Sequence, residues 1–126
     1  MTAVIADAVF DAALAYIKTN AVECNVVTAA DAVLVDSITL DASNWTGPGD
    51  NGGAGGGRKL TCLVEDTGDM SNISVTSPGA ATKVALKTTA GAATLITADI
   101  TGAPITLGAA DKVNLGTFDV ILKDPT

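Results

Sequence analysis

The stretch GPGDNGGAGGGRKLTC, residues 47–62, decides between two kinds of fold. It holds seven of the thirteen glycines of the chain, and a GxGxxG pattern begins at Gly47. A dinucleotide-binding turn of this kind must open into a helix, because the helix N-terminus holds the pyrophosphate. Here Leu60 and Cys62 alternate with polar residues, which predicts a strand. The pattern therefore favours a β-rich fold over an α/β nucleotide-binding fold.

The same glycines come close to a P-loop, which needs Lys followed by Ser or Thr to reach phosphate and magnesium. The chain offers Arg58, Lys59 and Leu60 instead. We therefore expect residues 46–57 to form a flexible, glycine-rich surface loop between strands, because glycine adopts positive φ freely and is costly to order. The alternative is a loop that becomes ordered only against a partner subunit.

Short alternating segments separated by turn residues fill the chain from about residue 22 onward. The clearest is TKVALKT at residues 82–88, with Val84 and Leu86 on one face and lysines on the other. The spacing predicts a mainly β fold, an antiparallel β-sandwich or barrel of about seven to nine short strands. The other candidates are ECNVV at 23–27, AVLVD at 32–36, SITL at 37–40, RKLTCLVED at 58–66, NISVT at 72–76, ATLITADI at 93–100, APITLG at 103–108 and DKVNLGTFDVILK at 111–123.

The first twenty residues, MTAVIADAVFDAALAYIKTN, predict one short N-terminal helix over about residues 4–19. Three charged residues fall on one face of this helix, and we expect the opposite, apolar side to pack on the core. The charged residues are Asp7, Asp11 and Lys18, and the apolar side carries Ile5, Val9 or Phe10, Ala13, Leu14 and Ile17. The segment lacks the basic start of a signal peptide and an apolar run of about 20 residues. We therefore expect a protein made in a cytoplasm, with no membrane partner.

Composition narrows the classes of function. The 126 residues suit a single β-rich domain, residues 1–126, and a net charge of −7 argues against nucleic acid as a partner. The chain has no His, the commonest general base and zinc ligand, so we expect no enzyme, no catalytic residue, no metal site and no cofactor. With only 3% aromatic residues the core must be thin, which favours support from neighbouring subunits.

Few side chains stand out as candidates for chemistry or contact. Cys24 and Cys62 fall at apolar positions of alternating segments, so we expect buried reduced thiols, with a disulfide between them left open. Trp45, next to the glycine-rich stretch, is either a lid on the core or an anchor on a partner. We name Trp45 and Arg58 as possible partner contacts.

The acidic segment EDTGDM, at residues 65–70, invites comparison with a calcium site. Its carboxylates are Glu65, Asp66 and Asp69, but the spaced pattern and terminal Glu of a calcium loop are missing. We expect a solvated turn.

The order of these segments resembles a family of small structural proteins of tailed-bacteriophage virions. The likeness rests on DAALAYIKTNA in the helix, ECNVV, GGGRKLTCLVED, the strand at residues 81–86, ATLITADI and the final TFDVILKDP, and it covers nearly the whole chain. It departs from the family at TAADAVLVDS, residues 28–37, where the family usually carries a stretch like PTTY.

The resemblance implies a virion component made in the host bacterial cytoplasm. The role expected from it is a capsid decoration or cement protein that binds the major capsid protein and copies of itself as a homo-oligomer on the particle. A tail or neck protein is the alternative, and a receptor-binding module is a further one, against which the four aromatic residues argue.

Overall fold

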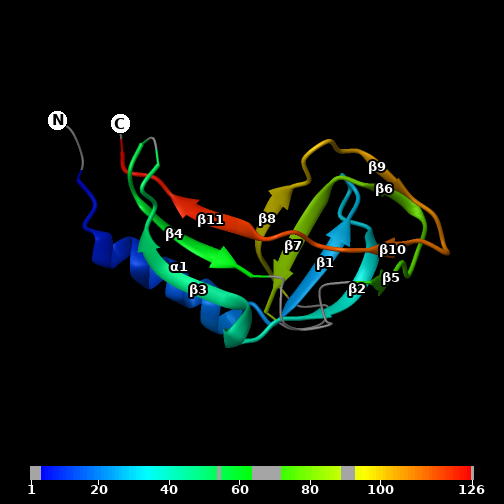
Figure 1. Cartoon of the computed structure of the whole chain (residues 1–126), viewed down its shortest axis with the longest axis horizontal. Coiled ribbons are helices and arrows are strands. Elements are labelled where there is room, and N and C mark those ends of the chain that lie inside the picture. The colour runs from blue at the N-terminus through cyan, green and yellow to red at the C-terminus, as the bar shows by residue number, and fades with distance from the viewer. Residues whose placement is uncertain (1–3, 54, 64–71, 89–92, 126) are drawn as a thin grey trace.

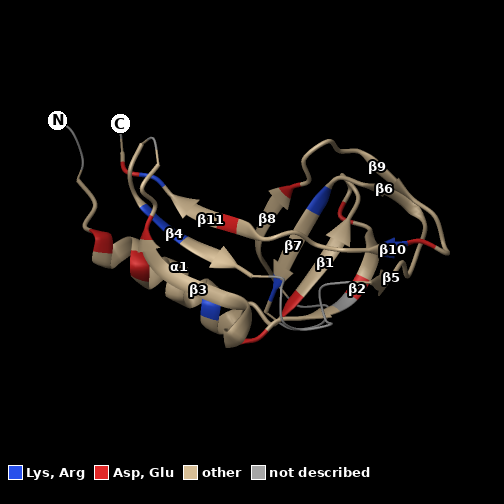
Figure 2. Ribbon diagram, in the orientation of Figure 1, with Lys and Arg blue, Asp and Glu red and all other residues tan. Residues whose placement is uncertain are grey.

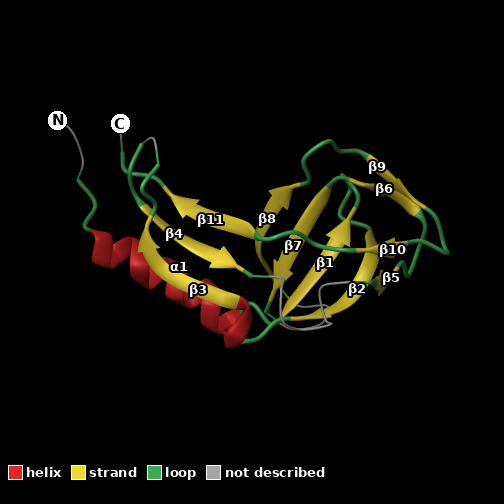
Figure 3. Ribbon diagram, viewed as in Figure 1, coloured by secondary structure: helices red, strands yellow, loops and turns green. Residues whose placement is uncertain are grey.

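The computed structural model describes residues 4–53, 55–63, 72–88 and 93–125. Within these ranges it contains one α-helix, one short 3-10 turn and eleven strands (Figures 1 and 3). The mainly β fold with an N-terminal helix is confirmed. The elements are α1 (Asp7–Asn20), β1 (Glu23–Val27), β2 (Val33–Thr39), η1 (Ala42–Asn44), β3 (Trp45–Asp50), β4 (Arg58–Cys62), β5 (Ile73–Ser74), β6 (Gly79–Ala81), β7 (Lys83–Lys87), β8 (Thr94–Asp99), β9 (Ile105–Leu107), β10 (Lys112–Val113) and β11 (Phe118–Leu122).

The predicted count of seven to nine strands is too low, for two physical reasons. Four of the strands, β5, β6, β9 and β10, are only two or three residues long, too short to show alternation. β3 lies in what we predicted as a loop. The helix also begins at Asp7 rather than at residue 4, because Ala6 has extended backbone angles, φ −66° and ψ 143°.

The strands form two larger antiparallel sheets and two small ribbons. The order is β2-β1-β7-β8 in the four-stranded sheet and β11-β4-β3 in the three-stranded sheet, and the ribbons pair β10 with β5 and β6 with β9. Helix α1 lies along the three-stranded sheet, against β3 and β4 (Figure 1). The ribbons lie at the opposite end of the molecule.

The core joins the helix to both larger sheets. Its fully buried side chains are aliphatic or thiol groups, since the chain offers few large rings; they include Leu14, Cys24, Val26, Val35, Ile38, Leu60 and Cys62. On β4 the predicted inward positions, Leu60 and Cys62, are confirmed. On β7 the predicted Leu86 is buried, but so is its neighbour Ala85, and the predicted Val84 is only partly buried. Strand β1 departs further from alternation, because Asn25 and Val27 are buried as well.

Strand β2 joins two segments that we predicted separately, AVLVD and SITL. Its pairing with β1 shifts register, from Val26↔Val35 to Val27↔Val33. Such an irregularity turns successive side chains away from strict alternation. Leu34 and Val35 are therefore both buried, although they are neighbours in the strand.

Candidate interaction surface

The structure places Trp45, the first predicted partner contact, inside the protein. Its side chain is only 4% exposed and belongs to the core. The indole packs edge-to-face on Phe118, with ring centroids 6.3 Å apart and planes at 85°. Of the two alternatives for Trp45, the structure therefore supports the first, in which the side chain covers the core. A side chain buried in this way offers almost no area to a partner, and we no longer treat Trp45 as a contact.

Arg58, the second predicted contact, is engaged within the chain. Its guanidinium donates from Nε and Nη2 to the two carboxylate oxygens of Asp11, at 2.7 and 3.0 Å. This fork geometry joins α1 to the start of β4. Close by, Lys18 Nζ donates to the carbonyl oxygen of Gly47 on β3, at 3.1 Å. Both basic groups therefore hold the helix on the β3–β4 hairpin.

The glycine-rich stretch forms this hairpin, which corrects the prediction of a flexible loop over residues 46–57. Residues up to Asp50 belong to β3, and the turn is held by Asn51, whose side chain donates to the carbonyl oxygen of Gly56 at 2.9 Å. Gly57 is buried, with φ +89°, and a Cβ there would overlap the carbonyl oxygen of Leu122. The glycine at this position lets the turn pack against the end of β11. Strand β4 follows the glycines, as predicted.

Helix α1 docks with only part of the apolar side that we predicted. Phe10 and Leu14 are buried and Ile17 packs partly against the core, but Val9 and Ala13 are exposed. With 3.6 residues per turn, the docked residues are centred roughly a sixth of a turn from the centre of the predicted side, toward the charged residues. The two polar contacts to the hairpin described above lie on this side of the helix. They draw the charged edge of α1 toward β4, which carries basic positions beside it (Figure 2).

This rotation leaves an apolar row on the outside of the helix, which we call the helix stripe. It consists of Val9, Ala12, Ala13 and Tyr16, spaced i, i+3, i+4 and i+7, so the four side chains share one face. Val9 is 60% and Tyr16 58% exposed. The side chain of Ile5, four positions before Val9, is also exposed.

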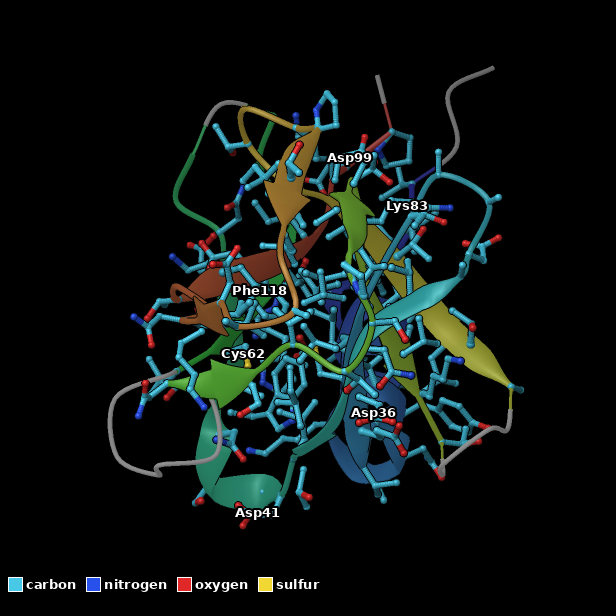
Figure 4. The ribbon with its side chains drawn as sticks, turned by 90° about the vertical axis from the view of Figure 1, so that its right-hand side faces the viewer. Asp36, Asp41, Cys62, Lys83, Asp99 and Phe118 are labelled. Atoms are coloured by element: carbon cyan, nitrogen blue, oxygen red, sulfur yellow. The ribbon has the colours of Figure 1, made fainter. Side chains whose placement is uncertain are left out.

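A second apolar feature is an open groove between β8 and β11, the edge strands of the two larger sheets. Its smaller cavity, about 210 Å³, lies between these two strands, and a larger one, about 530 Å³, extends beyond Phe118 and is lined mainly by residues 100–107 and 112–117. Val84, Ala98 and Phe118 line both, so the two cavities adjoin one another. Figure 4 labels Phe118 and Asp99, which line the larger cavity. We call this feature the β8–β11 groove.

The cysteines and the acidic segment add no reactive centre to this picture. Cys24 and Cys62 are both free and buried, as expected, and desolvation raises the pKa of Cys24 to about 12 and of Cys62 to about 11. Such thiols are poor nucleophiles at neutral pH. Glu65, Asp66 and Asp69 lie outside the described residues. Within the described ranges, no three His, Cys, Asp or Glu side chains gather as a metal site would require.

Comparison with known proteins adds no assignment. No protein-family model, no curated protein and no solved structure matches the chain. In the part of the chain that the structure describes, no helix has the length and apolar character needed to cross a membrane.

The sequence did not single out the helix stripe or the β8–β11 groove. A signal for the stripe was present, because the apolar residues of α1 span more than one face and a helix packed on one side must leave some of them outside. The groove had no such signal, since its walls come from strands far apart in the sequence and its position depends on how the two sheets meet.

Proposed function

We propose that this protein is a structural component of a tailed-bacteriophage virion, a decoration or cement protein that binds the outer surface of the head. The resemblance of its segment order to small virion proteins supports the virion assignment. The single structural observation that supports a binding role is the helix stripe. One face of α1 is fixed to its own hairpin while the opposite face presents Val9 and Tyr16 to solvent.

In this proposal the helix stripe docks on the major capsid protein. Burying apolar surface yields about 25 cal/mol per Å², and a valine and a tyrosine together can supply a few kcal/mol per site. A shell repeats the site many times, so each copy that bridges neighbouring capsid subunits adds contacts that internal pressure must break. The charge of −7 makes free copies repel one another wherever their acidic surfaces meet.

The test adds purified protein to mature heads that lack it. We expect wild-type protein to bind in a fixed ratio to the capsid lattice and to raise the temperature at which DNA escapes. Val9→Asp and Tyr16→Asp should lower the bound ratio at least tenfold, because each sets a charge in the apolar contact. Thr106→Asp, at an exposed position on β9 remote from α1, is the matched control and should bind as wild type.

The position of the protein on the virion distinguishes the proposal from its alternatives. Labelling that finds the protein only on the tail, or in a single ring at the neck, refutes the shell role and favours a tail or neck component. Absence from purified particles refutes the virion assignment. Equal binding by wild type, Val9→Asp and Tyr16→Asp would show that the helix stripe is not the contact.

A further inference from the structure

The β8–β11 groove separates two strand edges. Among the described residues, β8 pairs only with β7 and β11 only with β4. An edge strand presents unpaired backbone N–H and C=O groups, which can take up another extended segment. The groove therefore offers both backbone partners and apolar walls, and its larger cavity, about 530 Å³, is of the size that holds a few apolar side chains.

The N-terminal arm, residues 4–6, has the complementary properties. Val4 is 90% exposed and Ile5 is also exposed, so the arm makes little contact with its own chain. Its last residue, Ala6, is extended, as a β-strand requires. Residues 1–6 carry no charged side chain. An apolar segment without charged side chains gains most in water by entering an apolar groove next to a free strand edge.

The positions of arm and groove point to two different molecules. The arm leaves the protein at one end, whereas β9 and β10, which border the larger cavity, lie at the other end (Figure 1). Helix α1, which carries the arm at its N-terminus, is fixed to the hairpin by Asp11 and Lys18. Without release of the helix, the arm meets a groove of this kind only on a second copy.

Charge also favours this contact over others between copies. Each copy carries −7, so two copies repel wherever acidic surfaces meet. The arm has no charged side chain, and the larger cavity is lined by one acidic and one basic residue, Asp99 and Lys112, whose formal charges cancel. The arm and this cavity can therefore come together without bringing like charges into contact.

We propose that the N-terminal arm of one copy binds the β8–β11 groove of a second copy, adding a strand beside β8 and filling the larger cavity. The contact is head-to-tail, because arm and groove are different surfaces. Head-to-tail contacts close into rings or extend into chains, according to the rotation between neighbours. Such a contact links neighbouring copies directly, separately from the helix stripe.

The test is complementation between two variants in solution. Val4→Asp places a charge in the arm and leaves the groove unchanged. Ala98→Phe, at an exposed position that lines both cavities, fills the groove and leaves the arm unchanged. We expect wild type to self-associate with rising concentration in sedimentation experiments, and each variant alone to associate at least tenfold more weakly. Mixing the two should restore a one-to-one dimer and no larger species, since one good arm meets one good groove.

Two controls keep the result specific. Val9→Asp, on the helix stripe, and Thr94→Phe, on β8 but outside both cavities, should associate as wild type. Fluorescence of the only tryptophan, Trp45, verifies folding, and Ile105→Asp replaces Ala98→Phe as the groove variant if the latter is misfolded. Higher salt should strengthen the association by screening the repulsion between copies.

Three outcomes would overturn the inference. They are wild type that stays monomeric up to roughly 1 mM, variants that associate as wild type does, and mixtures that restore no dimer. Loss of association in Val9→Asp, with Val4→Asp unaffected, would assign self-contact to the helix stripe instead. The measurement uses no phage particle, so its failure leaves the head-binding proposal standing, and failure of head binding leaves this contact standing.

Discussion

Replacing Gly57 by alanine tests whether the glycine-rich turn is packed rather than free. Gly57 has φ +89°, and a Cβ there would overlap the carbonyl oxygen of Leu122 and lie 2.8 Å from the Cα of Lys123. Both atoms are backbone, so no side chain can rotate away. The turn or the end of β11 must move, which disturbs the last pair of the β4–β11 ladder, Arg58↔Leu122.

The magnitude follows from comparison with Gly52. This residue also has positive φ, +64°, but no described heavy atom lies within 4 Å of a Cβ placed there. Gly52→Ala carries the left-handed strain of about 1–2 kcal/mol, partly offset by about 0.4–1 kcal/mol from a less flexible unfolded chain. Gly57→Ala adds overpacking of about 1–3 kcal/mol. We therefore expect Gly57→Ala to be the more destabilising by about 1–3 kcal/mol.

Urea denaturation followed by Trp45 fluorescence measures this difference, because the single, buried tryptophan reports loss of the core. In thermal melts the two variants should differ by roughly 4–12 °C, at about 4 °C per kcal/mol for a domain of this size. Equal midpoints for Gly57→Ala and Gly52→Ala would refute the packing of the turn against β11. They would restore our first interpretation of a free loop.

Three further predictions concern the thiols and the contact between Asp11 and Arg58. Cys24 and Cys62 should react with a thiol reagent only after unfolding, and stability should fall as pH rises above 9, where the unfolded thiols ionise but the buried ones, with pKa values of about 12 and 11, do not. Fast native labelling would contradict their burial. Asp11→Asn should lower the urea midpoint only slightly, since the ion pair with Arg58 is partly exposed, and high salt should shrink that effect.

Alternation of apolar and polar residues correctly predicted strands that have one buried and one solvent-exposed face. Strand β4 is the clear case, with Leu60 and Cys62 inside and Lys59 and Thr61 partly exposed. The same logic failed at β1, because Asn25 and Val27 are buried as well as Cys24 and Val26. Alternation of apolar and polar residues identifies a strand with one buried and one exposed face. It carries no information on a contact made by residues far along the chain.

The prediction of a flexible loop over residues 46–57 was wrong for a related reason. Flexibility was inferred from composition, but Gly57 is a glycine because β11 approaches it, and β11 begins some sixty residues later. The same hairpin explains the positions of the two candidate contacts, of which Trp45 is buried, while a partner contact at Arg58 stays a prediction. Because the stretch forms a hairpin, Trp45 at its base lies in the core and the side chain of Arg58 pairs with Asp11.

The orientation of α1 connects these local outcomes to the proposed surfaces. A helix with apolar residues over more than half its circumference can bury only the part that faces its sheet, and polar contacts choose which part that is. Arg58 and Lys18 select the edge near Asp11, which leaves Val9 and Tyr16 in water. If this is the cause, Arg58→Met should weaken the selection, let the helix turn, and reduce the exposure of Tyr16. Iodination or quenching of the tyrosine in the folded variant measures that exposure directly, and unchanged exposure would show that core packing of Leu14 alone sets the orientation.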